Sequence, residues 1–235
     1  MNLQNMTCIT LTSKGYLDYT LNMLHSLKNL GLENLFTTYC LDESSFYELG
    51  NLGFNVNRYS NKLLDSKELE DEVPYYGTTD FNKFMYAKMD TIRKELRKYP
   101  YVLYSDSDVV FKKNFLKSEN LFKNLDFLAM KDFSADSPQK TSICAGFMVI
   151  KSNFKTKYLF NPKDIQKKNF SVHDQEVINS KKHRFNYDYL DENKFSNGSY
   201  FCKYYSKLDP SVVHFNYIVG SKKKDVMKEL GCWYL

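Results

Sequence analysis

Short apolar runs alternate with longer amphipathic segments along the first two thirds of the chain. Apolar residues recur near helical spacing in the amphipathic segments, most clearly between residues 81 and 98. Helices are therefore predicted at 16–30, 43–49 and 81–98, and strands at 6–11, 35–41, 54–59, 101–104, 109–111, 126–130 and 143–150. This alternation predicts an α/β domain with a mixed, mostly parallel sheet flanked by helices.

Two aspartates interrupt the pattern where a buried strand should not carry charge. Asp106 and Asp108 follow the apolar run 101–104, and the apolar character returns directly after them. On extended backbone, residues i and i+2 point to the same side, so both carboxylates can converge on one point. Open sheets bind ligands at the carboxyl ends of their strands, and two carboxylates there suit a hard cation such as Mg²⁺ or Mn²⁺. The alternative is a strand-end turn with two solvated aspartates.

Composition indicates one globular domain over residues 1–235. Apolar residues make up 43% of the chain and aromatic residues 16%, and no linker or repeat divides it. The net charge of +5, from 33 basic and 28 acidic residues, is too diffuse to favour nucleic acid as a partner. No signal peptide or membrane-spanning run is visible, and the five scattered cysteines lack metal-type spacing. A cytoplasmic location with reduced thiols is therefore expected.

The second half of the chain supplies further polar groups. His214 follows a short apolar run, and Gly220 with the lysines at 222–224 comes a few residues later. Together with the aspartate pair they offer a third metal ligand, a glycine that lets backbone approach a ligand, and cations for phosphate. Asp174 starts a helix-like segment, where the simpler interpretation is an N-cap. A lone histidine or a lysine run is usually structural, so the functional interpretation depends on the aspartate pair.

Several motifs occur in the order typical of one enzyme family. They are Asp106/Asp108 after an apolar strand, the run 145–150, Asp174/Gln175/Asn179, and His214 followed by Gly220 and Lys223. This series resembles the nucleotide-diphospho-sugar glycosyltransferases of the GT-A fold, closest to the retaining branch with glycogenin-like members. The segments 10–16 and 231–233 are also similar to that group. The resemblance implies a single Rossmann-like GT-A domain. Its nucleotide-binding half would be 1–111, and its acceptor-binding half 112–235 would end in a metal- and phosphate-binding segment.

The resemblance also implies roles for individual residues. Asp106, Asp108 and His214 would bind Mn²⁺ or Mg²⁺. Asp174 would bind sugar hydroxyls, and Gln175 would lie beneath the anomeric carbon. The nucleotide would be held by Thr10, Thr12, Tyr16, Asp42, Lys88, Ser107, Gly220 and Lys223, and the donor sugar also by Cys144, Ala145 and Gly146. Cys144 stands where the family frequently has asparagine, and the choice of phosphate ligand among lysines 222–224 is open.

The activity implied is transfer of a hexose or pentose from a nucleotide-sugar, with UDP-sugar as the default, to an acceptor hydroxyl with retention. The acceptor would be a glycan, a protein or a lipid-linked group. One alternative is a haloacid-dehalogenase-type, Mg²⁺-dependent phosphatase with Asp106 as nucleophile and Asp108 as general acid. Three predicted strands before Asp106 disfavour it, because such enzymes carry this motif on an early strand. The other is an inert nucleotide-sugar-binding module.

Three segments outside the motifs bear on mobility. The polar stretches 61–79 and 193–198 are expected to be flexible loops. The tail that carries His214 either closes over bound nucleotide or docks permanently on the core through Leu230 and Trp233.

Overall fold

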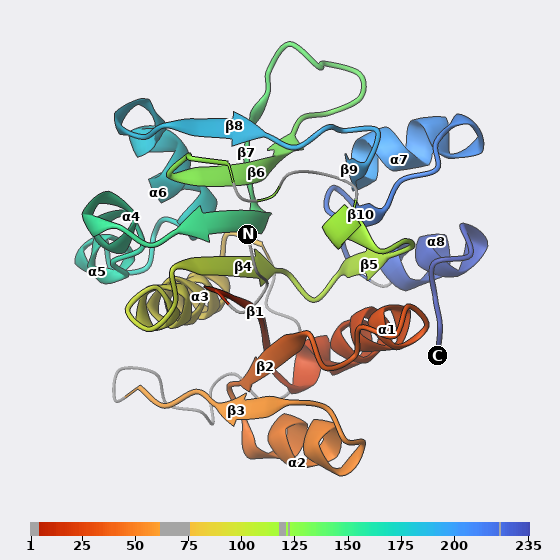
Figure 1. Cartoon of the computed structure of the whole chain (residues 1–235), viewed down its shortest axis with the longest axis horizontal. Coiled ribbons are helices and arrows are strands. Elements are labelled where there is room, and N and C mark those ends of the chain that lie inside the picture. Colours follow the sequence, from red (N-terminus) through yellow and green to blue (C-terminus); the bar gives the residue numbers. More distant parts are fainter. Residues whose placement is uncertain (1–4, 62–75, 118–120, 122, 221) are drawn as a thin grey trace.

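The computed structural model describes residues 5–61, 76–117, 121, 123–220 and 222–235 and shows a layered α/β fold (Figure 1). The main sheet is seven-stranded, in the order β3-β2-β1-β4-β7-β6-β8. These strands are β1 (Met6–Thr12), β2 (Phe36–Cys40), β3 (Val56–Arg58), β4 (Tyr101–Ser105), β6 (Phe127–Asp132), β7 (Ser142–Lys151) and β8 (Tyr187–Tyr189). Neighbouring strands run parallel, except that β7 is antiparallel to both β4 and β6. The predicted mixed, mostly parallel sheet is confirmed.

A second, three-stranded sheet was not predicted. It has the order β5-β10-β9 and comprises β5 (Val109–Phe111), β10 (Val212–His214) and β9 (Phe195–Asn197). The chain leaves the main sheet after β4, so β5 pairs antiparallel with β10 rather than with a strand of the main sheet. In that register His214 is the partner of Val109. The small sheet therefore brings a residue from the C-terminal region beside the aspartate pair.

Helices cover both faces of the main sheet (Figure 1). They are α1 (Leu17–Lys28), α2 (Glu43–Asn51), α3 (Thr79–Glu95), α4 (Phe154–Leu159), α5 (Lys163–Lys167), α6 (Asp174–Lys181), α7 (Gly198–Tyr204) and α8 (Lys222–Glu229), with short 3-10 turns at Lys14–Tyr16, Phe115–Lys117, Lys182–Arg184 and Tyr205–Lys207. The helix predicted at 81–98 is α3, which begins after Thr78 because that hydroxyl accepts a hydrogen bond from the Phe81 amide. The helix predicted at 16–30 opens as a 3-10 turn and becomes α-helical at Leu17.

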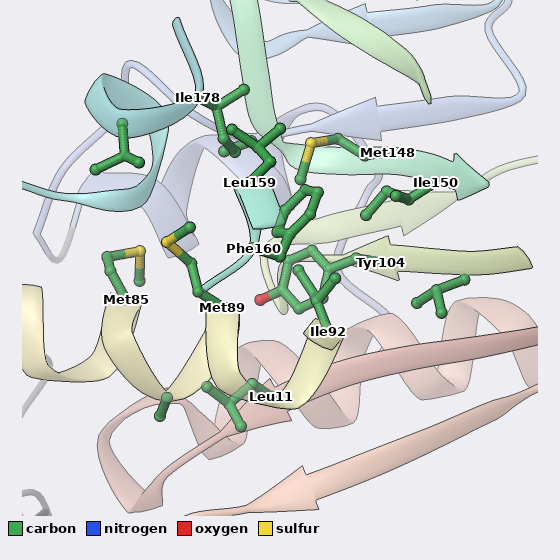
Figure 2. Packing of buried hydrophobic residues seen from close by; sticks show 14 of the residues in the cluster. Leu11, Met85, Met89, Ile92, Tyr104, Met148, Ile150, Leu159, Phe160 and Ile178 are labelled. Atoms are coloured by element: carbon green, nitrogen blue, oxygen red, sulfur yellow. The ribbon is translucent and has the colours of Figure 1, made fainter. Parts of the chain in front are cut away.

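The period-two alternation of the strands divides the core into two layers. Val102 and Tyr104 face the layer that contains α3, α4, α5 and α6, whereas Leu103 faces the layer that contains α1. Figure 2 shows the first layer, with Met89 and Ile92 of α3 directed toward Tyr104 of β4. Burying each large apolar side chain contributes roughly 1.5–3 kcal/mol. This packing fixes α3, and with it the polar side chains that α3 carries to the end of β4.

The C-terminal segment docks on the core. The Asn22 side chain donates from Nδ2 to the Cys232 carbonyl at 3.0 Å and accepts from the Tyr234 amide at 2.6 Å. The Trp233 ring meets the Tyr19 ring edge to face at a centroid distance of 5.9 Å. Of the two expectations for this tail, the structure contains the docked arrangement.

The two stretches expected to be flexible have different outcomes. Most of 61–79 lies outside the described residues. The expectation for 193–198 is wrong for its second half, because Phe195–Asn197 forms the buried strand β9. Within the described ranges no helix is long and apolar enough to cross a membrane. The cysteines are all free thiols.

Candidate active site

Asp106 and Asp108 lie in the tight turn that links β4 to β5. The backbone amide of Asp106 donates to the Gly146 carbonyl of β7 at 2.7 Å, which fixes the start of this turn. Oδ1 of Asp106 accepts from Lys88 Nζ at 3.0 Å and from the Tyr104 hydroxyl at 2.9 Å. The Asp108 carbonyl accepts from the Phe215 amide at 3.0 Å. Both aspartates are thus bonded to protein groups from several elements, so the alternative of a turn with two solvated aspartates is wrong.

His214 completes a cluster with the two aspartates. Its Nε2 lies 3.1 Å from Asp108 Oδ1 and 3.7 Å from Asp106 Oδ2, and one ligand atom from each residue falls within 4.8 Å of the others. Burial alone would raise the pKa of Asp108, but the charges of Lys223 and His214 hold this pKa far below its usual range. Carboxylate oxygens with one imidazole nitrogen suit a divalent cation such as Mn²⁺.

Gly146 on β7 makes room for this cluster. A Cβ atom there would lie 2.2 Å from His214 Cε1 and 2.6 Å from Asp106 Oδ2. No such contact is tolerable, so any larger residue would push the imidazole or the carboxylate away. The sequence analysis assigned Gly146 to the donor sugar, and the structure places it directly behind two of the three proposed metal ligands. The close approach of ring, carboxylate and backbone fits a site built to hold a small cation.

A buried ion triad stands beside the cluster. Lys88 of α3 is 1% exposed, and its Nζ lies 3.0 Å from Asp106 Oδ1 and 2.8 Å from Asp174 Oδ2. Burial would lower the pKa of Lys88, but the two carboxylates raise it above its usual value, so Lys88 stays charged. Burial would raise the pKa of Asp174, but Lys88 and His173 lower it to about 2. One lysine therefore ties the aspartate pair to the first residue of α6.

Gln175 is held in a fixed orientation by two partners. Its Oε1 accepts from the Ala145 amide at 3.0 Å, and its Nε2 donates to Asp132 Oδ2 at 2.8 Å. Asn179, one turn later on α6, bonds both the amide and the carbonyl of Ile143 at 2.9 Å. These bonds attach α6 to the first residues of β7. They place Gln175 beside Ala145, and the role of both residues toward a donor sugar stays a prediction.

Asp132 was missed by the sequence analysis. Besides Gln175, it accepts from Nδ2 of Asn216 at 3.0 Å and from the Ser142 hydroxyl at 3.3 Å. Asn216 follows β10, so Asp132 joins the main sheet to the segment after His214. A signal was present, because Asp132 follows the predicted strand 126–130 just as Asp106 follows 101–104. The rule that polar groups gather at the carboxyl ends of strands would have identified it.

Cys144 contacts the cluster from behind. It is 1% exposed, and its Sγ lies 3.2 Å from Nδ1 of His214 and accepts from the Gly146 amide at 3.4 Å. Its side chain is therefore engaged with His214 in this structure. Contact between Cys144 and a donor sugar stays a prediction that this arrangement does not support.

Three of the residues assigned to the nucleotide, Thr10, Thr12 and Tyr16, lie in β1 or in the 3-10 turn that follows it. Tyr16 is near the cluster, since burial and then the charges of Asp108 and Asp106 raise its pKa above the usual value. The Thr12 hydroxyl accepts from Thr20 at 2.7 Å, and Thr10 is fully buried with no hydrogen-bond partner for its hydroxyl among the described residues.

Asp42 caps α2, accepting at 2.8 Å from both the Ser45 and the Lys14 amides. Its carboxylate is therefore committed to structure here, and its contact with a nucleotide base, like those of Thr10 and Thr12, stays a prediction. Ser107 is buried within the turn between the aspartates.

Among the three lysines at 222–224, Lys223 points to the cluster. Its Nζ lies 2.5 Å from Asp108 Oδ2, whereas Lys224 pairs with Asp18 at 2.7 Å and lies over the Trp233 ring. Lys223 belongs to the first turn of α8, and Gly220 precedes it with a φ of +67°. A left-handed backbone there favours glycine. The arrangement puts one cation and the start of a helix beside the two aspartates.

Comparison with known proteins identifies the family. The model of the nucleotide-diphospho-sugar transferase family matches residues 31–227. No curated protein gives a significant match. A glycosyltransferase involved in glycosylation of the major capsid of PBCV-1 is 13% identical with a TM-score of 0.59, covering 95% of this chain and 98% of its own.

Two further solved structures have the same fold. The galactosyltransferase LgtC, in complex with donor and acceptor sugar analogs, is 12% identical with a TM-score of 0.60, over 98% of this chain and 97% of its own. Mouse xyloside xylosyltransferase 1 is 12% identical with a TM-score of 0.56, and the match covers 90% of this chain and 98% of that protein's chain. At these identities the likeness shows the GT-A fold, and the family model covers well over half of the chain. The chain therefore belongs to the nucleotide-diphospho-sugar transferase family and is a glycosyltransferase.

Proposed function

We propose that this glycosyltransferase depends on Mn²⁺ or Mg²⁺ and moves a hexose or pentose from a UDP-sugar to an acceptor hydroxyl with retention. The observation that carries the proposal is the convergence of Asp106, Asp108 and His214 at the carboxyl end of β4. Three ligand atoms of the types that hard and borderline cations prefer meet there, in a cradle that only glycine at position 146 leaves open. One domain over 1–235 would carry both the nucleotide-binding half, 1–111, and the acceptor-binding half, 112–235.

Charge develops on the β-phosphate as the nucleoside diphosphate leaves. A divalent cation bound by the three ligands would supply Lewis-acid stabilisation of that charge. Lys223, whose Nζ contacts Asp108 in this structure, would be the lysine that meets the diphosphate. Gly220 and Ser107 would present backbone groups to the phosphates. Lys88 keeps Asp106 in place through their ion pair and would also contact the donor.

Asp174 and Gln175 would face the donor sugar. Asp174 is ionised at neutral pH, since its pKa is lowered to about 2, and can accept hydrogen bonds from sugar hydroxyls. The Gln175 carbonyl is held by the Ala145 amide, and an amide oxygen is weakly basic. Gln175 is therefore a poor nucleophile, and we favour same-face attack by the acceptor, with the departing phosphate taking its proton. The positively charged character that develops at the donor carbon would be stabilised by the nearby amide and carboxylate oxygens.

The donor proposal draws on the relatives and on the site. Relatives with this fold include a galactosyltransferase and a xylosyltransferase, so both hexose and pentose transfer occur on it. Tyr16 lies near the aspartates and would either stack on the nucleoside or form one wall of its site. Thr10, Thr12 and Asp42 would line the rest of that site. The phosphatase alternative is set aside because the chain belongs to the transferase family.

The test is a donor panel with a direct reading of the released nucleotide. The protein is incubated with UDP-glucose, UDP-galactose, UDP-xylose and GDP-mannose, with Mn²⁺ or with chelator, and free nucleoside diphosphate is measured. UDP release that requires the cation supports the proposal. Tight calorimetric binding of GDP with none of UDP would overturn the donor assignment, and release of phosphate from simple phosphoesters would revive the phosphatase.

A further inference from the structure

The excess of positive charge is concentrated in one segment of the chain. Residues 151–184 contain nine Lys or Arg and three Asp or Glu, a net charge of +6, whereas the whole chain has a net charge of +5. This segment carries α4, α5 and α6. In Figure 1, α4 and α5 lie with α3 on the left, at the end of the sheet where β4 starts. Positive charge gathered on one side of a protein attracts anionic partners to that side.

A surface cavity between α3 and α4 lies on this side. Its volume is about 240 Å³, and it is lined by Arg93, Arg97, Phe154, Lys157 and Tyr158. Arg93 and Arg97 are one turn apart on α3, where two like charges repel each other. Among the residues that the structure describes, no carboxylate pairs with Arg93, Arg97 or Lys157. The cavity therefore holds three cations without a counter-charge, which suits a compact anion such as a phosphate group.

Arg93 is fixed in a position to bind that anion. Its Nε donates to the Lys157 carbonyl at 3.1 Å, and its Nη1 donates to Asn161 Oδ1 at 3.2 Å. These bonds hold α4 against α3, and they leave the Nη2 donors of Arg93 unused by the described residues. The side chains of Arg97 and Lys157 bond to no described residue, so both can turn toward a ligand. One wall of the cavity is thus preformed, which lowers the cost of binding.

The two aromatic rings that line the cavity are largely exposed. The Phe154 side chain is 85% exposed and that of Tyr158 is 55% exposed. They are residues i and i+4 of α4, so they lie on the same side of this short helix, whereas Leu159 is buried in the core. Nζ of Lys181 lies 5.5 Å from the centroid of the Tyr158 ring. Exposed rings among cations are typical of segments that lie in the interfacial region of a membrane.

We propose that the α3–α4 surface, formed by the five cavity residues, binds an anionic lipid membrane. Arg93, Arg97 and Lys157 hold a headgroup phosphate in the cavity. Phe154 and Tyr158 enter the boundary between headgroups and acyl chains. The cavity has the size of one headgroup, which favours a lipid over a nucleic-acid strand, and the exposed rings favour a lipid over a free phosphate compound.

This surface is separate from the proposed active site. Arg97 precedes β4 and Asp106 follows it, so the cavity and the aspartate pair lie at opposite ends of that strand. A membrane bound at the α3–α4 surface leaves the aspartate pair accessible to a nucleotide-sugar. The proposal therefore does not depend on the donor, the cation or the acceptor of the transferase.

Co-sedimentation of the full chain with lipid vesicles, without donor or cation, measures the proposed binding. The vesicles are phosphatidylcholine alone, or phosphatidylcholine mixed with an equal amount of phosphatidylglycerol. One variant is Phe154→Ala, which removes the most exposed ring. The other is the double variant Arg97→Gln/Lys157→Gln, because these two side chains bond to no described residue and their loss should not disturb the fold.

The controls make the same kinds of change elsewhere. Tyr205→Ala removes a ring that is 54% exposed and follows α7. The double variant Lys28→Gln/Lys228→Gln removes two exposed charges on α1 and α8, on the opposite side of Figure 1 from α4. Each control matches one test variant in the ring or in the charge that is lost.

We expect the wild type to bind the vesicles that contain phosphatidylglycerol and not those of phosphatidylcholine alone. Arg97→Gln/Lys157→Gln should weaken this binding about 30-fold, at roughly fivefold for each cation. Phe154→Ala should weaken it about tenfold, and both controls should bind like the wild type. The proposal is wrong if the wild type does not prefer anionic vesicles, or if the test variants bind them as tightly as the controls.

Two soluble probes distinguish the other possible occupants. Inorganic phosphate and a DNA duplex are titrated into the wild type and into Arg97→Gln/Lys157→Gln. Binding of inorganic phosphate that the double variant loses, without binding to anionic vesicles, would show a site for a free phosphate compound and overturn the lipid assignment. Tighter binding to the DNA duplex than to anionic vesicles would overturn it as well.

Discussion

The Sγ atom of Cys144 lies 3.2 Å from Nδ1 of His214, so the other ring nitrogen, Nε2, is the one that faces Asp106 and Asp108. A metal-binding histidine is usually oriented by a partner on its second nitrogen, which fixes both the ring and its tautomer. In this chain a thiol occupies that position. The same Sγ accepts from the Gly146 amide, so the orientation is built into β7.

Replacing Cys144 should therefore change cation affinity. Cys144→Ala removes the partner of Nδ1, and loss of such a partner typically weakens metal binding about 10- to 100-fold. Cys144→Ser keeps a group that can hold Nδ1 and should bind Mn²⁺ more tightly than the alanine variant. Mn²⁺ titration followed by electron paramagnetic resonance measures this directly. Cys202→Ala, at a half-buried thiol on α7, is the control, and equal affinity in Cys144→Ala and the wild type would refute the role.

Adding one methyl group at Gly146 should disrupt the cluster. The new Cβ would lie 2.2 Å from the His214 ring, so the imidazole or the Asp106 carboxylate must move. We expect Gly146→Ala to lose donor turnover by on the order of 100-fold, comparable to the loss of a main charge-stabilising group. Gly50→Ala is a matched control, since its Cβ would make an ordinary 3.5 Å contact with Val56. Full activity of Gly146→Ala would show that the ligands do not need this approach.

The Lys88–Asp174 ion pair should make stability depend on acid pH. The folded-state pKa of Asp174 is about 2, below its ordinary value of 3.8, so the folded state binds fewer protons than the unfolded state. The contribution is therefore fully present above pH 4 and is lost as pH falls toward 2. It amounts to roughly 2 kcal/mol, from about 1.4 kcal/mol per pKa unit.

Chemical denaturation of the wild type and of Asp174→Asn between pH 2 and 6 measures this contribution. The stability difference between the two proteins should shrink as the pH falls toward 2. Asp188→Asn, which breaks an exposed pair with Lys123, should show almost no such trend. A difference for Asp174→Asn that is constant with pH would mean that Lys88 does not hold the Asp174 charge.

Much of the fold follows from local patterns in the sequence. The strand before Asp106 and the helix that carries Lys88 were predictable because their apolar residues repeat with the periods of two and 3.6 that buried faces require. The convergence of Asp106 and Asp108 followed from their spacing on extended backbone. The inclusion of His214 rested on its position after a short apolar run and on the resemblance, and the structure brings its side chain to the same point.

The remaining features depend on contacts between distant segments. The small sheet places His214 opposite Val109, more than 100 residues earlier, and no local pattern specifies that pairing. The partner of Cys144 is equally invisible in the sequence, because a cysteine in an apolar run looks like a core residue. The hydrogen bond from Asn216 to Asp132 likewise joins positions 84 residues apart, which no local spacing reveals.

The most direct test of the metal-dependent transferase is UDP release by the wild type and by Asp108→Asn after exhaustive chelation and stepwise return of Mn²⁺. Asp108 contacts both His214 and Lys223, so loss of its charge should abolish cation binding while the fold persists. We expect the wild type to be inactive without metal and to recover with Mn²⁺. Asp108→Asn should remain at least about 100-fold less active at every concentration. Asp209→Asn, at an exposed surface pair, serves as the control. Full turnover by the chelated wild type, or by Asp108→Asn, would contradict the proposed metal site.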